Sequence, residues 1–169
     1  MAGTIEERAV ASKFPVSVIM ERRRIIGNPW ATEGWTALGV TVGRVAAAGG
    51  QNPVPLVSGP DATQFLWSGL TLQFFPDEAE SYYHNLTVEV PGCYVVVRPQ
   101  EDGTPEPILV TVSFDAAAAY QEGGETVYSV PLPPELYLAA EAFVLAHYVP
   151  EPRRKRKRDD WKGGGRGGQ

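Results

Sequence analysis

The sequence predicts one α+β domain, a mainly antiparallel, strongly curved sheet or partly open barrel of about six strands, covered by two short helices and one C-terminal helix. The chain has 169 residues, a usual length for one domain. Its 18 glycines and 15 prolines indicate many turns between short elements. Several short stretches alternate apolar and polar residues, as half-buried strands do.

The chain divides into three parts by composition. Residues 1–13 are polar and rich in alanine, and we expect a flexible arm. Residues 14–150 hold the apolar patterns and form the predicted domain. Residues 151–169 are basic and rich in glycine, without an apolar pattern, and are predicted to be disordered.

The first predicted strand ends in three consecutive arginines. Its buried face is formed by alternating apolar residues, namely Phe14, Val16, Val18 and Met20. Arg22 and Arg24 keep the parity of that face, whereas Arg23 points the other way. An arginine of inward parity at a strand end either extends to solvent at the rim or meets a carboxylate. A role in binding a partner is the alternative.

A turn at 27–29 precedes two tryptophans, Trp30 and Trp35. Large aromatic side chains are core or cover the end of a barrel in most cases, but they are also enriched at protein interfaces. The second predicted strand follows, and the residues expected on its inward face are Leu38, Val40 and Val42. Residues 45–60 show little pattern and are predicted to form a long surface loop.

The middle of the chain alternates strands with short helices. Residues 65–75 form the clearest strand, and Pro76 starts a short helix that ends near Asn85. A buried strand is predicted over 88–98 and another over 108–114.

In the last third, Asp115 is predicted to cap a short helix over 116–122. Residues 126–132 read as an edge strand because two prolines at its end cannot donate to a ladder.

The final helix is predicted from Pro134 to about Tyr148 and is apolar almost all round. One apolar stripe contains Leu136, Ala140, Phe143 and His147, and the other contains Tyr137, Val144, Leu145 and Tyr148. A helix of this kind is buried on more than one side. In so small a domain, a partner protein could cover one of those sides.

Charge is distributed unevenly along the chain. The tail holds 8 of the 15 Lys and Arg and 3 of the 20 Asp and Glu, a net charge of +5, which leaves −10 for the rest. The basic run attracts phosphate, so nucleic-acid binding through the tail is an alternative function. The acidic body would repel the same phosphates.

Catalytic and metal-binding patterns are missing from the sequence. One cysteine and two distant histidines give too few ligands for a structural zinc or iron–sulfur site. Cys93 opens a run of valines and is expected to pack as a small apolar residue. His84 is expected at a helix end or the surface, and His147 beside the C-terminal end of the final helix. We therefore predict neither an enzyme nor a cofactor.

The lone cysteine forms no internal disulfide, and no apolar run reaches the ~18 residues of a membrane helix. The N-terminal residues lack the apolar region of a secretory signal. These observations make the cytoplasm the expected compartment.

Several short motifs, in their order and spacing, resemble one known family over roughly 16–149. They include Glu21-Arg22-Arg23, Pro29-Trp30, Tyr83-His84-Asn85-Leu86, Tyr94-Val95-Val96-Val97-Arg98, Val110-Thr111-Val112-Ser113 and Val130-Pro131-Leu132-Pro133. The family is the bacterial one catalogued as domain of unknown function 3305. Its members tend to be encoded beside molybdenum- or tungsten-dependent formate dehydrogenases and their maturation factors. The resemblance implies an accessory, assembly or small-subunit role and supplies no catalytic residues.

Together these observations predict a protein that binds a formate dehydrogenase component or its maturation factor. Arginine and tryptophan often dominate interface energy, so the expected contact surface combines the arginine strand end with the final helix. The residues expected to bind the partner are Arg22, Arg23, Arg24, Trp30, Trp35, Tyr137 and Tyr148. A small-molecule site in the mouth of the barrel is a third alternative.

Overall fold

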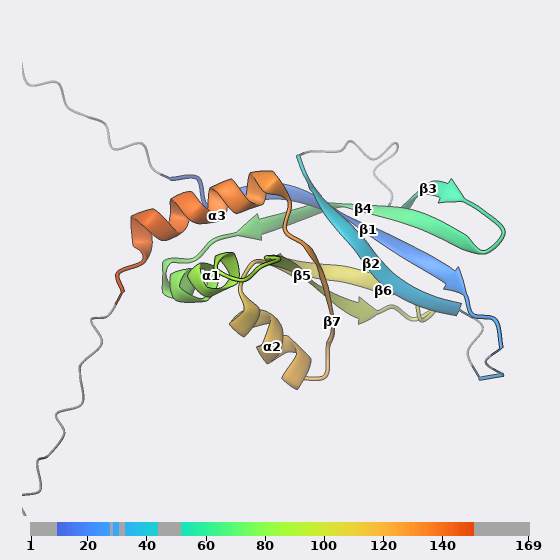
Figure 1. Cartoon of the computed structure of the whole chain (residues 1–169). Helices are drawn as coiled ribbons and strands as arrows, with labels where there is room; N and C mark the ends of the chain where they lie inside the picture. The colour runs from blue at the N-terminus through green and yellow to red at the C-terminus, as the bar shows by residue number, and fades with distance from the viewer. Residues whose placement is uncertain (1–9, 28, 31–32, 44–51, 151–169) are drawn as a thin grey trace, which may run out of the picture.

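The structure is a computed structural model that describes residues 10–27, 29–30, 33–43 and 52–150 (Figure 1). Most of the expected arm and the whole expected tail lie outside the described residues. Within the described residues the regular structure begins at Lys13, and the carbonyl of Ser12 accepts a hydrogen bond from Phe74 N at 2.8 Å.

The larger sheet has four antiparallel strands in the order β2-β1-β4-β3. They are β1 (Lys13–Arg24), β2 (Glu33–Val42), β3 (Val54–Ser58) and β4 (Ala62–Gln73). β1 is paired on both sides. Its alternating residues Val16, Val18 and Met20 are buried, as their spacing predicts.

The smaller sheet has three antiparallel strands in the order β6-β5-β7. They are β5 (Gly92–Pro99), β6 (Pro105–Thr111) and β7 (Thr126–Pro131). Val95, Val96 and Val97 follow one another in β5 and are all buried, so this central strand is covered on both faces. β7 lies at an edge, as its prolines predict.

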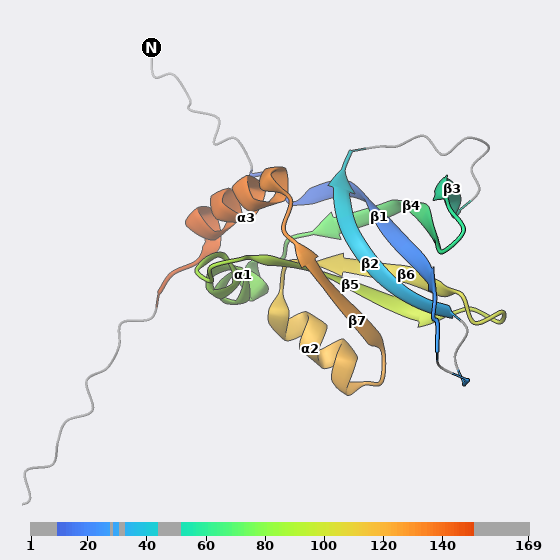
Figure 2. The same cartoon turned by 45° about the vertical axis from the view of Figure 1, so that its right-hand side comes forward.

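The two sheets lie one above the other in both ribbon views (Figures 1 and 2). Where the sheets meet, β4 lies beside β6 and β2 lies beside β7. Between β7 and β2, Tyr128 Oη donates a hydrogen bond to the carbonyl of Trp35 at 3.2 Å. Within the described residues the sheets do not join into a closed barrel. The predicted α+β class is confirmed, with two facing sheets in place of one.

Helices close one end and one side of these sheets (Figure 2). They are α1 (Ala79–Leu86), α2 (Phe114–Glu122) and α3 (Pro134–His147), and a 3-10 helix (Pro76–Glu78) leads into α1. α1 packs against α3. Between them Phe143 lies 5.4 Å from Phe74 and 5.9 Å from Tyr82, measured between ring centroids. None of the helices in the described part of the chain has the length and apolar character needed to cross a membrane.

The prediction of a surface loop over 45–60 is wrong at its end. β3 forms there and pairs with β4, which gives the described part of the chain seven strands where about six were expected. The side chain of Asn52 holds the start of this strand, because its Nδ2 donates to the Ser68 carbonyl at 2.6 Å and its Oδ1 accepts from Ser68 N at 3.1 Å. These partners are sixteen residues apart, beyond the reach of a local pattern.

The predicted inward face of β2 is wrong at Leu38, which is 41% exposed. The register between β1 and β2 shifts there, because Ile19 pairs with Gly39 while Met20 pairs with Ala37. The extra residue forms a bulge, which changes the alternation of side chains along the strand. Ala37 is buried in its place, whereas Val40 is buried and Val42 packs against the core, as predicted.

Several element boundaries also differ from the prediction. β4 spans Ala62–Gln73 and not 65–75, and β6 ends at Thr111 and not at 114. β5 begins at Gly92 and not at 88, and β6 begins at Pro105. The cap of α2 is Ser113 and not Asp115, since Ser113 Oγ accepts from Ala116 N at 3.0 Å. Asp115 lies in the first turn, where its charge favours the helix N-terminus.

Candidate protein-binding surfaces

The structure separates the residues predicted to bind a partner into two groups. Arg22–Arg24 and the two tryptophans lie where β1 ends and β2 begins. Tyr137 and Tyr148 belong to α3 and the residue that follows it. These two places are at opposite ends of the molecule in both ribbon views (Figures 1 and 2).

Arg22 is held by aromatic side chains of the neighbouring strands. Its guanidinium lies 5.8 Å from the ring centroid of Trp35 and 5.3 Å from that of Phe65, within the range of a cation–π contact. Its Nε is 4.0 Å from a carboxylate oxygen of Glu33. The side chain thus reaches the rim and meets a carboxylate, as its parity predicts.

Arg23 pairs with Glu21 on the opposite face of β1. Its Nε donates to Glu21, whose side chain is 7% exposed, and Gln64 donates to the same carboxylate at 3.4 Å. The hydrogen bond from Arg23 lowers the pKa of Glu21, and Glu21 in turn raises the pKa of Arg23. Arg23 therefore neutralises a nearly buried charge.

Arg24 lines a polar hollow of about 360 Å³ together with Arg22, Glu33 and Asp61. The formal charges of these two arginines and two carboxylates cancel.

The prediction that the tryptophans belong to the core is right for Trp35, which packs against the core, and wrong for Trp30, which is 93% exposed.

A mainly apolar groove of about 460 Å³ lies between α1 and α3, and we refer to it as the α1–α3 groove. Its lining residues are Tyr83, Leu86, Thr87, Tyr137, Glu141, Val144, Leu145, Tyr148 and Pro150. The rings of Tyr83 and Tyr148 stack with centroids 4.9 Å apart. Both tyrosines predicted on the final helix thus line one groove.

α3 has more apolar surface than the core covers. The buried residues are Leu136, Ala140 and Phe143 of the first predicted stripe and Val144 of the second. Leu138 is 65% exposed and Leu145 79%, and Val149 beyond the helix is 82% exposed. The expectation that this helix needs a second covering surface agrees with these exposures.

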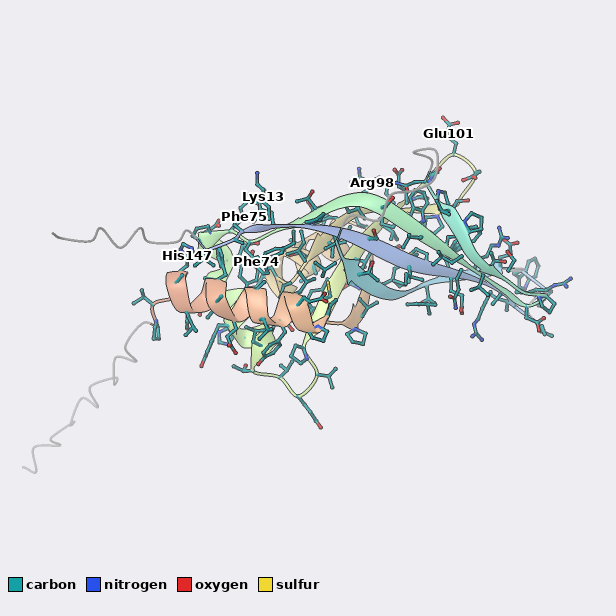
Figure 3. All side chains as sticks on the ribbon, turned by 90° about the horizontal axis from the view of Figure 1, so that it is seen from above. Lys13, Phe74, Phe75, Arg98, Glu101 and His147 are labelled. Atoms are coloured by element: carbon teal, nitrogen blue, oxygen red, sulfur yellow. The ribbon has the colours of Figure 1, made fainter. Side chains whose placement is uncertain are left out.

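A second hollow, of about 440 Å³, lies beside the groove and is polar. We refer to it as the acidic hollow, and its lining residues are Pro76, Asp77, Ala79, Glu80, His147, Tyr148 and Val149. Tyr148 belongs to both linings and separates them. Figure 3 shows His147 at this end of the molecule, near Phe74 and Phe75.

Sequence reasoning missed Tyr83 because its neighbour Tyr82 has the same side chain and a different environment. Tyr82 is fully buried, whereas Tyr83 is 41% exposed and faces the groove. The signal available was the motif 83–86, in which Leu86 also lines the groove. Asn85 of that motif is structural, since its amide bonds both Gly92 and Val112.

Cys93 is buried in the core, as predicted. Burial raises the pKa of the Cys93 thiol to about 12, so the nucleophilic thiolate is scarce at neutral pH. His84 is at the surface, 3.6 Å from Glu80. His147 ends α3, and its ring is 4.3 Å from that of Phe143.

We expect Cys93→Ala to lower the free energy of unfolding by about 1–2 kcal/mol near neutral pH. The wild type should lose stability from about pH 9 to about pH 12, because the unfolded thiol ionises at its ordinary pKa of 9.0 while the folded thiol stays protonated. Cys93→Ala should lose less over that range. Urea unfolding of both proteins from pH 8 to 11 measures the difference, and equal slopes would contradict the raised pKa.

Within the described residues, no group of three or more His, Cys, Asp or Glu side chains is placed to hold a metal ion.

Comparison with known proteins gives one match. The family model described as "Protein of unknown function (DUF3305)" matches residues 15–157. No curated protein matches the chain, and no solved structure does. Since the match spans most of the chain and nearly all of both sheets and α3, the chain belongs to the DUF3305 family.

Proposed function

We propose that this chain is a non-catalytic protein that binds another protein, as an accessory protein, assembly factor or small subunit of a cytoplasmic formate dehydrogenase system. The observation that carries the binding role is the α1–α3 groove with the exposed apolar residues beside it. Leu138, Leu145 and Val149 are each at least 65% exposed around one helix. An apolar groove accompanied by exposed apolar side chains is typical of a docking site.

The aromatic composition of the groove also supports a protein partner. Tyr83, Tyr137 and Tyr148 together line it. Tyrosine contributes large contact area with few rotatable bonds and is enriched where binding energy concentrates. The groove is open along Leu145, so its surface continues onto the outer side of α3.

The arginine end is less suited to dominate the interface than the sequence suggests. Arg22 is engaged with Trp35 and Phe65, and Arg23 with Glu21. Arg23, Arg24 and Trp30 are exposed, and Arg23 is already paired with Glu21. We assign Arg24 and Trp30 a secondary contact in the proposed complex.

The choice of a formate dehydrogenase system follows from the family resemblance. These enzymes use molybdenum or tungsten with iron–sulfur proteins, whereas this chain has one cysteine and two histidines to offer as ligands. In the proposed role, the redox chemistry belongs to the partner. The nucleic-acid alternative depends on residues 151–169, which lie outside the described residues.

The test is affinity capture of the tagged chain from its native cells, with variants at each surface. We expect the wild type to retain a formate dehydrogenase component or maturation factor and Leu145→Asp to lose it, because a carboxylate in the apolar groove lacks a partner. Val57→Asp is the matched control, because Val57 is 59% exposed on β3, away from α1 and α3. It should capture as the wild type does.

Each outcome bears on a separate part of the proposal. Retention by Leu145→Asp combined with loss in Arg24→Glu/Trp30→Ala would move the interface to the arginine end. Retention by every variant would refute both surfaces. A wild-type protein that captures no component of a formate dehydrogenase system would refute the assignment to that system.

A further inference from the structure

We infer that the α1–α3 groove binds a basic amphipathic segment of another protein, in which a large apolar side chain is followed within about two helical turns by Lys or Arg. The inference rests on the proposed binding role and adds the chemistry of the partner. It follows from the arrangement of the apolar groove and the acidic hollow on either side of Tyr148.

The apolar part of the occupant is indicated by the shape of the groove. The stacked rings of Tyr83 and Tyr148, with Val144 and Leu145, form walls that an aliphatic or aromatic side chain can fill. An apolar anchor seated in a groove, with the segment's other side in solvent, is a common way in which an amphipathic helix is recognised.

The charge of the occupant is indicated by the residues around its anchor. Glu141 lines the groove itself, and Asp77 and Glu80 line the acidic hollow beyond Tyr148. Among the described residues that line either one, none is Lys or Arg. Three carboxylates around an apolar anchor favour a cationic segment and disfavour an anionic one.

The same charges argue against a second copy of this chain. In a symmetric dimer, α3 would pack on α3, and one such arrangement crosses the two helices antiparallel at their middle. Glu141 lies near the middle of Pro134–His147, so the two Glu141 side chains would approach each other. The phosphates of a nucleic acid would meet the same repulsion.

The chain's own tail follows Pro150, which lines the groove, and is a competing occupant. It supplies basic charge and one large apolar side chain, Trp161, but Trp161 directly follows Asp159 and Asp160, whose carboxylates would be repelled by those that line the groove and the acidic hollow. A segment of a separate protein without acidic residues beside its apolar anchor fits the groove better. The experiment includes the tail as an explicit competitor.

The probe is a displayed library of random 12-residue peptides, selected on the full-length chain. We expect binders that are lost on Leu145→Asp and are enriched in Lys or Arg near a large apolar residue. Glu141→Lys should weaken these peptides by about tenfold or more, because an attraction becomes a repulsion. Glu101→Lys is the control, since Glu101 is exposed in the β5–β6 turn, far from His147 (Figure 3), and should change their affinity less than about twofold.

Several outcomes would overturn the inference. Groove-dependent peptides that are neutral or acidic, or whose affinity is unchanged by Glu141→Lys, would refute the preference for a basic segment. The groove would still be a binding site. A peptide of residues 151–169 that displaces the selected peptides would assign the groove to the tail. A dimer in light scattering that Leu145→Asp dissociates would assign it to a second copy. An absence of groove-dependent peptides would refute the inference, whereas cellular capture decides the proposed function separately.

Discussion

Phe143→Ala is expected to lower the free energy of unfolding by about 3–5 kcal/mol, the usual cost of deleting a buried aromatic side chain. Phe143 is 1% exposed and is the side chain of α3 that meets both Phe74 and Tyr82. Its loss leaves a cavity between α3, α1 and the end of β4. Urea unfolding followed by circular dichroism measures the change.

The matched control is Leu138→Ala on the same helix. Leu138 is 65% exposed, so its truncation should change the free energy of unfolding by less than about 0.5 kcal/mol. A cost below about 1 kcal/mol for Phe143→Ala would contradict the packing of α3 described above. It would also remove the basis for a groove between α1 and α3, since Phe143 holds the two helices together.

Asn85→Ala is expected to destabilise the chain by at least about 3 kcal/mol, because buried polar groups that lose a partner cost about 1–3 kcal/mol each. Asn85 Nδ2 donates to the carbonyl of Gly92 at 2.8 Å and to that of Val112 at 2.9 Å. Its Oδ1 accepts from Gly92 N at 3.0 Å. The substitution leaves one buried N–H and two buried carbonyls without these bonds.

Thr87→Ala is the control for this prediction, because Thr87 Oγ1 also bonds a carbonyl, that of His84 at 2.7 Å, but at an exposed position. Its cost should stay below about 1 kcal/mol. Equal melting temperatures for Asn85→Ala and the wild type would show that α1 is not held to β5 in this way. The position of Tyr83 in the groove would then lose its support.

The sequence by itself determined the elements whose patterns are local. Alternation along β1 predicted the burial of Val16, Val18 and Met20, and the valine run predicted the covered strand β5. Pro134 and the apolar stretch after it predicted α3 within one residue of its observed end. Each of these patterns acts within one strand or a few helical turns, so nearby residues suffice to read it.

Tertiary structure decided the features that depend on residues far apart in the chain. The bulge that exposes Leu38 arises from the register between β1 and β2, and β3 forms against β4 with the help of Asn52 and Ser68. Register and bulges are set by which strand lies alongside, and a local pattern does not contain that partner.

The candidate site divides in the same way. The apolar excess of α3, with Tyr137 and Tyr148, was readable from the sequence because helical spacing alone brings those residues to one side. That Tyr83 stacks on Tyr148, and that Arg22 and Arg23 are engaged within the domain, was decided by packing between separate elements. A side chain's availability to a partner depends on what the folded chain has already placed beside it, and that contact exists only in three dimensions.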